Sequence, residues 1–202
     1  NHKMPVIVIA GDGDLLGEGL SHFIHSARAN HDITVILHNN GVFGLTTGQA
    51  SPTAIPGFKS KPLPAEITDE PINPCALAIM HQAGFVARGF AGDQNGLSDL
   101  IKKAIAHPGF SLVDVLQPCV TFNPDKSYIW YRQRIKPVKT LTSDVLLGIK
   151  NSLWTDERIS IGIIYQNSRL AFHSTYPQLA KDSLLNTTGK KRDIRKLLKE
   201  FN

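Results

Sequence analysis

The hydrophobic positions near the start of the chain alternate between continuous apolar runs and helical spacing. Residues 5–10 form a continuous apolar run, which is typical of a buried parallel strand. Residues 16–29 then place apolar side chains at helical spacing, with polar side chains on the opposite face. A second apolar run occupies residues 33–38. These three segments predict a β-α-β unit.

The same alternation resumes after a long connection. Residues 41–72 are rich in Gly, Pro, Thr and Ser, and a loop of this length inside a compact domain is usually functional or disordered. The pattern then predicts a helix from Asn73 to about Gln82, a strand at 85–90, a helix at 94–106 and a strand at 110–116. Because strands and helices alternate up to residue 116, we expect an α/β fold with a doubly wound, mostly parallel sheet.

The pattern changes after Pro118 into a polar and aromatic segment. A helix at 143–153, a strand at 159–165 and a basic helix at 190–201 are predicted beyond it. We therefore expect a first domain at residues 1–135 and a C-terminal α+β extension at residues 136–202. The basic helix has an apolar stripe that can pack on its own subunit, whereas its charge could attract an acidic electron carrier.

Composition narrows the choice of partners and compartment. The chain has 202 residues, 42% of them hydrophobic, which is enough for one substantial domain plus an extension. The net charge of +5 is modest and lies largely in the last dozen residues, so we expect no nucleic-acid partner. No apolar run approaches the roughly 20 residues that span a bilayer, and we expect no signal peptide. Two cysteines do not make a disulfide framework, and we expect a reducing, cytoplasmic location and no membrane partner.

Polar residues follow the first two predicted strands at matching positions. The loop Gly11-Asp12-Gly13-Asp14 comes after the first strand, and Asn39-Asn40 ends the second. A helix of about 12 residues rises about as far as the returning strand descends, so both loops reach the same edge of the sheet. We therefore expect Asp12 and Asn40 to lie side by side.

These residue types suit a magnesium ion that holds a diphosphate. Mg²⁺ takes oxygen ligands in near-octahedral geometry, commonly from few protein groups plus phosphates and water. Asp12 offers a carboxylate, Asn40 an amide oxygen, and the following turn a backbone carbonyl, which we assign to Val42. Gly11 and Gly13 let the backbone approach phosphates, and the next helix begins with the positive end of its dipole. The alternative is a nucleotide-type fold with ordinary turns at both strand ends.

Several motifs together resemble one family of enzymes. GDGD, HNNGVFGLTTGQASPT, EPINP, GFVARGFAGD and LVDVLQPCVTFN closely resemble the β subunit of 2-oxoacid:ferredoxin oxidoreductases, which are thiamine diphosphate (TPP) enzymes. The resemblance covers roughly residues 5–135 and implies the diphosphate-binding half of the TPP fold. It implies that Asp12, Asn40 and the Val42 carbonyl bind Mg²⁺. It also implies that TPP is surrounded by Gly11, Asp12, Gly13, Asp14, Asn40, Val42, Leu45 and Thr46.

Cys119 lies in the motif PCVTFN, just past the strand predicted at 110–116. In the family, the corresponding cysteine is one of four thiolates that bind a [4Fe–4S] cluster, so the resemblance implies this role for Cys119. We expect Cys75, the other cysteine, to be structural. Family members carry a Cys-x-x-Cys pair and a third cysteine upstream of the Gly-Asp-Gly loop. Because that region is absent here, we expect a fragment with its N-terminal part missing, an incomplete set of cluster ligands and no activity alone.

The resemblance also implies a reaction and partners. The reaction is the TPP-dependent oxidative decarboxylation of a 2-oxoacid, 2-oxoglutarate or pyruvate, to an acyl-CoA. Electrons pass through a [4Fe–4S] cluster to ferredoxin. The implied partners are an α subunit that supplies the activating glutamate, ferredoxin, CoA and the 2-oxoacid.

The loop that carries Leu45, Thr46 and Thr47 is the expected catalytic segment, because it lies beside the cofactor and could reach the substrate carboxylate. Some relatives carry lysine at the position of Thr47, so the identity of the 2-oxoacid stays open. Two alternatives also stay open. One is another TPP-dependent decarboxylase or synthase, which has no reason to keep the PCVTFN cysteine. The other is a non-catalytic TPP-binding fragment.

Overall fold

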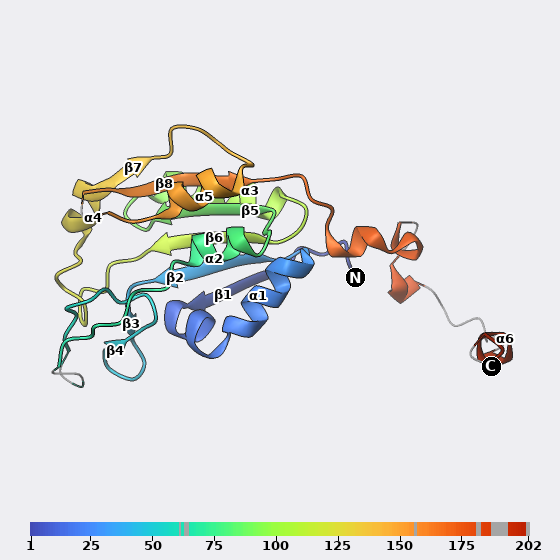
Figure 1. The fold of residues 1–202 in the computed structure, drawn as a ribbon, viewed down its shortest axis with the longest axis horizontal. Coiled ribbons are helices and arrows are strands. Elements are labelled where there is room, and N and C mark those ends of the chain that lie inside the picture. The colour runs from blue at the N-terminus through green and yellow to red at the C-terminus, as the bar shows by residue number, and fades with distance from the viewer. Residues whose placement is uncertain (61, 63–64, 156, 181–182, 187–193, 201–202) are drawn as a thin grey trace.

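The computed structural model describes residues 1–60, 62, 65–155, 157–180, 183–186 and 194–200, and it is built around a six-stranded sheet (Figure 1). The strands lie in the order β1-β2-β6-β5-β8-β7. Their bounds are Ile7–Gly11 (β1), Thr34–Asn39 (β2), Phe85–Phe90 (β5), Ser111–Leu116 (β6), Ile135–Pro137 (β7) and Ile159–Gln166 (β8). All neighbouring pairs are parallel except β5 and β8. The predicted α/β fold with a mostly parallel sheet is confirmed.

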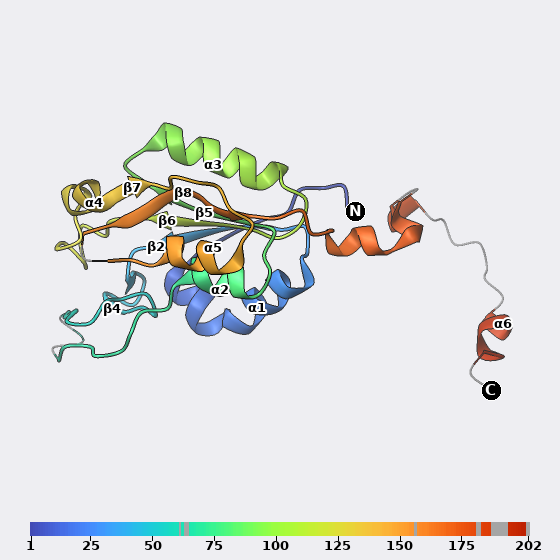
Figure 2. The same ribbon diagram turned by 45° about the horizontal axis from the view of Figure 1, so that its top comes forward.

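Helices cover both faces of this sheet (Figure 2). One face carries α1 (Leu20–Ala29), α2 (Pro74–Met80) and α5 (Val145–Ser152), and the other carries α3 (Gln94–Ala106). The smaller elements are a π-helical turn (Asp14–Glu18), the hairpin strands β3 (Val42–Phe43) and β4 (Gln49–Ala50), α4 (Tyr128–Arg134), α6 (Ile194–Leu198) and 3-10 turns at Phe172–Thr175, Pro177–Leu179 and Leu184–Asn186. Helices on both faces make the sheet doubly wound, as predicted.

Alternation along each central strand divides the core into two layers. Val35 and Leu37 of β2 pack with α1 and α2, whereas Ile36 packs on the side of α3. The strands β5 and β6 are buried along their whole length because helices cover both of their faces. This rigid centre fixes the positions of the loops at the strand ends.

The helix predicted at 16–29 is interrupted. A π-helical turn at Asp14–Glu18 precedes α1, and Gly19 separates the two. The Gly19 N–H donates to the Asp14 carbonyl at 2.7 Å, which closes the wide turn. A Cβ at this position would lie 2.9 Å from the same carbonyl oxygen, so the junction requires glycine. Apolar spacing alone does not reveal such a break.

The prediction of a buried first strand is wrong. β1 is an edge strand that pairs only with β2, and Ile9 is 66% exposed. The cause is coverage: the π-helical turn at Asp14–Glu18 contacts β1, whereas α3, on the other face of the sheet, lies over β5, β6 and β2. A continuous apolar run therefore identified a strand of the parallel sheet but not its place within the sheet.

The segment after residue 135 contributes to the main sheet. β8 pairs with β5, and β7 pairs with β8. The division into residues 1–135 and 136–202 stays a prediction. Of the basic helix predicted at 190–201, the structure describes α6, which lies apart from the sheet in both views, while residues 190–193 and 201 are outside the described residues (Figures 1 and 2). Within the described part of the chain, no helix has the length and apolar character needed to cross a bilayer.

Candidate active site

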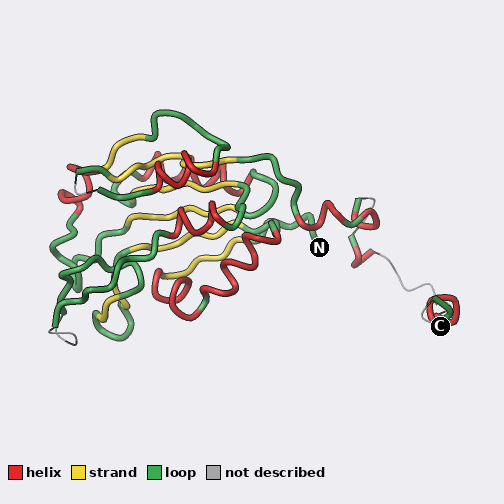
Figure 3. Tube along the Cα trace, in the orientation of Figure 1, coloured by secondary structure: helices red, strands yellow, loops and turns green. Residues whose placement is uncertain are grey.

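The loops that follow β1, β2 and β6 meet at the carboxyl edge of the sheet, where the β3–β4 hairpin also lies (Figure 3). The parallel register pairs Gly11 with His38 and Asn39 with Leu116. The Gly-Asp-Gly loop, the Asn39-Asn40 turn and the loop of Cys119 therefore begin next to one another. This is the position at which open α/β sheets bind ligands.

The carboxylate of Asp12 is the centre of this edge, and the residue is only 1% exposed. Its Oδ2 atom accepts hydrogen bonds from the backbone N–H groups of Gly41 at 2.7 Å and Asn40 at 3.3 Å. Its Oδ1 atom accepts one from the N–H of Gly13 at 3.1 Å. The predicted proximity of Asp12 and Asn40 is thus present, and it is the backbone of the Asn40 turn that contacts the carboxylate.

Two hydroxyl groups complete the surroundings of Asp12. Ser51 Oγ donates to Oδ2 at 2.7 Å, and Thr53 Oγ1 donates to the same atom at 2.5 Å. Sequence reasoning missed both residues, because nothing in a long Ser/Thr-rich loop distinguishes these two hydroxyls. All five donors are neutral, so they stabilise the ionised carboxylate without cancelling its charge. The site therefore holds a buried negative charge that can attract a cation.

Asn40 and Val42 present further oxygen atoms beside this charge. Asn40 Oδ1 accepts a hydrogen bond from the N–H of Val42 at 3.0 Å. The neighbouring Gly41 carbonyl accepts from the N–H of Ser51 at 3.2 Å, on the side of β4. Because backbone groups alternate in direction along an extended chain, the Val42 carbonyl points away from β4.

The oxygen atoms of this turn fit a magnesium ion. Asp12 Oδ1 and Asn40 Oδ1 each accept a single hydrogen bond, and each has a second lone pair. One carboxylate, one amide and one carbonyl leave three octahedral positions for phosphate and water oxygens, as Mg²⁺ prefers. The described residues contain no group of three or more His, Cys, Asp or Glu side chains suited to a metal. The group of oxygen atoms at Asp12 contains one acidic side chain, so the remaining metal ligands come from a bound phosphate and water.

The other residues of the Gly-Asp-Gly loop have local contacts. Asp14 is exposed, and its Oδ2 atom accepts from the N–H of Gly11 at 3.3 Å. Gly13 is covered by the ring of Phe43, and a Cβ there would lie 2.2 Å from that ring. The glycine is therefore required for a close approach, and the group that approaches it here is an aromatic side chain.

The three residues predicted as the catalytic segment lie in the turn between β3 and β4. Leu45 is 98% exposed, and Thr46 Oγ1 donates to Gln49 Oε1 at 2.6 Å. Thr47 has a φ of 73°, which is uncommon for a β-branched residue. The turn thus presents its side chains to solvent at the same edge of the sheet, and the catalytic role of these residues stays a prediction.

Cys119 is partly exposed in the loop after β6. Its sulfur accepts a hydrogen bond from the N–H of Phe122 at 3.4 Å, an interaction that suits a thiolate ligand. Asn123 ties this loop to the first site, because its N–H donates to the Cys119 carbonyl and its side-chain amide donates to the Asn40 carbonyl. Cys75 is fully buried, and burial raises the pKa of its thiol, which agrees with the expected structural role.

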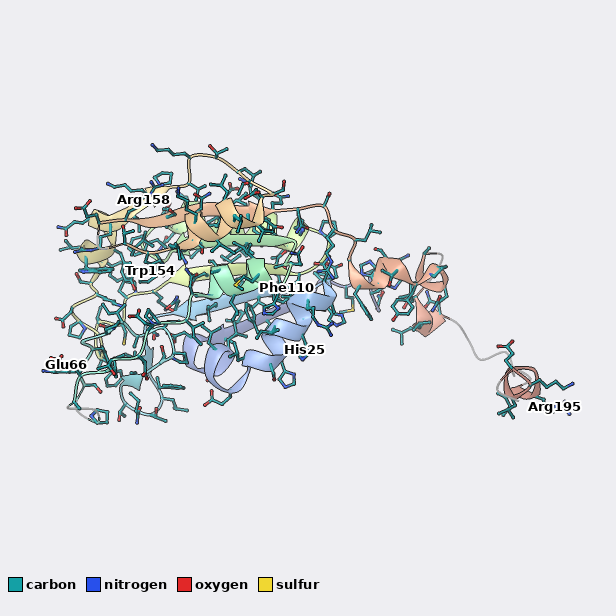
Figure 4. The ribbon with its side chains drawn as sticks, viewed as in Figure 1. His25, Glu66, Phe110, Trp154, Arg158 and Arg195 are labelled. Atoms are coloured by element: carbon teal, nitrogen blue, oxygen red, sulfur yellow. The ribbon has the colours of Figure 1, made fainter. Side chains whose placement is uncertain are left out.

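Lys126 is a further residue that the sequence did not indicate. It is only 6% exposed, and its ammonium lies 5.9 Å from the ring centre of Trp130 and 5.6 Å from that of Trp154. Trp154 lies toward the carboxyl edge of the sheet, whereas Phe110 lies toward the opposite edge of the sheet (Figure 4). Burial lowers the pKa of Lys126 to about 8, and the Asp12 carboxylate partly offsets this shift. The tryptophans that follow in sequence are the only signal that could have pointed to it.

The fold and this edge define the class of protein. Residues 1–115 match the family described as thiamine pyrophosphate enzyme, C-terminal TPP binding domain. Residues 119–181 match the family described as the C-terminal part of the pyruvate ferredoxin oxidoreductase beta subunit. The chain is therefore a TPP-enzyme domain followed by a segment typical of ferredoxin-linked oxidoreductases.

Individual relatives narrow this class. The chain is 43% identical to the 2-oxoacid:ferredoxin oxidoreductase subunit beta of Sulfolobus sp over 209 residues, covering 97% of this chain and 68% of that protein. It is 44% identical to the protein of the same name from Saccharolobus solfataricus, over 88% of this chain and 62% of the relative.

A solved structure supports the same family. The 2-oxoglutarate:ferredoxin oxidoreductase from Magnetococcus marinus, with 2-oxoglutarate, coenzyme A and succinyl-CoA bound, superimposes with a TM-score of 0.87 at 29% identity. The alignment covers 98% of this chain and 68% of that one. The chain belongs to the β-subunit family of 2-oxoacid:ferredoxin oxidoreductases, and it spans about two thirds of the length of these relatives.

Proposed function

We propose that this chain provides the cofactor-binding half of a 2-oxoacid:ferredoxin oxidoreductase, with Asp12, Asn40 and the Val42 carbonyl binding the Mg²⁺ that holds the diphosphate of TPP. The observation that carries the proposal is the buried Asp12 carboxylate, which receives neutral donors only. A buried carboxylate with no cation in direct contact is costly unless a cation binds there. The family relationship supports TPP as the ligand.

The residues of the chain act by binding and orientation. Backbone N–H groups of the Asn40 turn, together with Ser51 and Thr53, fix the carboxylate so that it need not reorganise when the metal binds. The loop with Leu45, Thr46 and Thr47 is the proposed contact to TPP and to the substrate carboxylate. Gly11 and Asp14 line the diphosphate side, whereas the Phe43 ring covers Gly13. When bound, TPP supplies an electron sink for the decarboxylation of the 2-oxoacid.

The proposal extends to partners that complete the enzyme. An α subunit supplies the remaining half of the active site, CoA accepts the acyl group, and ferredoxin accepts the electrons. Cys119 is proposed as one thiolate ligand of a [4Fe–4S] cluster, supported by its position at the same edge as Asp12 and by its partial exposure. Such a cluster needs four thiolates, and the two cysteines of this chain cannot provide them.

The proposal is tested by replacing the central carboxylate. Asp12→Asn keeps the shape of the side chain and removes its charge, so we expect TPP affinity in the presence of Mg²⁺ to fall by about 100-fold or more. Isothermal titration calorimetry measures this change directly. Asp12→Ala serves as a second variant, and circular dichroism verifies that both variants are folded.

Asp99→Ala provides the matched control, because Asp99 is an exposed carboxylate paired with Lys103 on the surface of α3. This variant should bind TPP as the unaltered chain does. If folded Asp12→Asn protein retained its affinity for TPP and Mg²⁺, the assignment of the metal site would be wrong.

A further inference from the structure

A mostly buried lysine, whose ammonium has no polar partner among the described residues, lies near the proposed cofactor site. Lys126 is 6% exposed, and within the described residues its ammonium forms no hydrogen bond and no ion pair. Lysine side chains are almost never buried to this extent unless they are paired. The two indole rings of Trp130 and Trp154 provide the contacts that the ammonium has, and they replace only part of its hydration.

The position of Lys126 relates it to Asp12. The Asp12 carboxylate is the charged group that acts on this ammonium, although the two side chains make no direct contact. The N–H of Lys126 donates to the Asn123 carbonyl, and the Asn123 side chain donates to the Asn40 carbonyl. The backbone of Lys126 is thereby connected to the same turn that surrounds Asp12.

A cavity adjoins these residues. It has a volume of about 750 Å³, and its lining includes Thr53, which donates to Asp12, and both tryptophans that contact Lys126. The cavity therefore reaches from the surroundings of the carboxylate to the surroundings of the ammonium. Lys126 itself lies behind this lining, which also includes the cationic side chains of Arg88 and Arg134.

We propose that Lys126 is a binding residue for the diphosphate of TPP and provides the positive charge that the Mg²⁺ site lacks. This inference rests on the proposed function of Asp12. Mg²⁺ beside a single carboxylate leaves a diphosphate only partly neutralised, and a mostly buried cation that feels the Asp12 charge supplies the missing charge. Before the ligand binds, the lysine is held in the interior at a cost in stability, which is typical of binding sites.

Lys126→Met tests the proposal through two quantities that should change in opposite directions, the thermal stability and the affinity for TPP. Without cofactor, the variant should unfold at a higher temperature than the unaltered chain, because an unpaired buried charge has been replaced by an apolar side chain. Its affinity for TPP with Mg²⁺ should fall by about 10- to 100-fold, the effect of losing a hydrogen bond to a charged group. Calorimetric titration of the native complex that contains this chain measures the affinity, and thermal denaturation gives the stability.

Inorganic pyrophosphate with Mg²⁺ serves as a second probe, because it contains the diphosphate without the organic rings. Its affinity should fall by the same factor as that of TPP. Lys126→Arg should retain most of the affinity, whereas Lys102→Met, at an exposed position on α3, should change neither affinity nor stability.

Three results would overturn the proposal. The first is unchanged TPP and pyrophosphate affinity in Lys126→Met, including the case in which only the KM for the 2-oxoacid rises, because the lysine would then serve the substrate carboxylate. The second is a loss of cofactor-free stability together with affinity, since a structural role would explain both. The third is a loss of TPP affinity with pyrophosphate affinity unchanged. Asp12→Asn, measured in parallel, separates these results from a failure of the metal-site assignment itself.

Discussion

Two buried aspartates of this chain have opposite surroundings. Asp114 lies in the middle of β6 and forms an ion pair with Arg88 at 2.7 Å, with both side chains fully buried. Asp12 lies at the end of β1 and accepts hydrogen bonds from N–H and hydroxyl groups only. One carboxylate is therefore paired with a cation inside the protein, whereas the other is hydrogen-bonded by neutral groups only.

The difference shows how burial can serve structure in one place and binding in another. Arg88 also donates to the Ser152 carbonyl at 3.0 Å and stacks near Trp154, so its charge is fixed by several contacts. A fully paired charge of this kind links α5 to the two central strands β5 and β6. The unpaired charges, Asp12 and Lys126, lie at the edge where the loops meet. These two side chains are the ones that we propose a ligand completes.

Breaking the Arg88–Asp114 pair should have the largest effect. Arg88→Met leaves Asp114 buried and uncompensated, so we expect a loss of about 3–5 kcal/mol of stability. Urea denaturation followed by circular dichroism gives the change. Adding Asp114→Leu to the same protein should restore part of the loss, because no unpaired charge remains. A decrease below about 1 kcal/mol in the single variant would contradict the structural role of the pair.

Removing one donor from Asp12 should have a smaller effect on stability and a visible one on binding. Thr53→Val keeps the shape of the side chain and removes the hydroxyl, so we expect about 1–2 kcal/mol of destabilisation. Because this hydroxyl orients the proposed metal ligand, TPP affinity should fall by about 10-fold. Calorimetric titration and urea denaturation measure the two effects. If the affinity stayed unchanged while stability fell, the hydroxyl would serve folding alone.

The pH dependence of the cofactor-free protein should show the smallest effect. The folded-state pKa of Lys126 is lowered to about 8 from 10.5, because burial outweighs the attraction of Asp12. Between these values the unfolded chain binds more protons at this position, so the contribution of Lys126 to stability rises with pH and the penalty is complete below about pH 8. The difference in unfolding free energy between Lys126→Met and the unaltered chain should therefore shrink from pH 8 to pH 10.

Other groups titrate in the same alkaline range. Burial raises the pKa values of Cys75 and Tyr131, and these two groups lower stability as pH rises. Arg88 lies against the same indole as Lys126 and keeps its charge throughout. Because Cys75, Tyr131 and Arg88 are present in both the unaltered chain and Lys126→Met, the difference in unfolding free energy between these two proteins reports the titration of Lys126. A difference that stayed constant across the range would show that Lys126 does not titrate there.

Much of the architecture could be predicted from the sequence. Apolar periodicity placed the main-sheet strands and the helices of the first 116 residues within a few positions, but it missed the β3–β4 hairpin and the π-helical turn. The family suggested by the motifs is confirmed by the relatives. The Asn73-Pro74 helix start is present as expected, with the Asn73 side chain accepting from the Ala76 N–H. The break at Gly19 and the exposed position of β1 could not be predicted, because apolar spacing reports the period of a segment and not what covers it.

The candidate site also has features that the sequence predicted and features that it did not. The sequence by itself determined that Asp12, Asn40 and Cys119 follow strands of one parallel sheet, and parallel strands bring such loops to one edge. Only the tertiary structure decided which groups surround them: Ser51 and Thr53 turned toward the carboxylate, and Lys126 enclosed by two tryptophans. Local periodicity is encoded in neighbouring residues, whereas the burial of a charge depends on segments far apart in the chain that meet only when the sheet and its loops pack together.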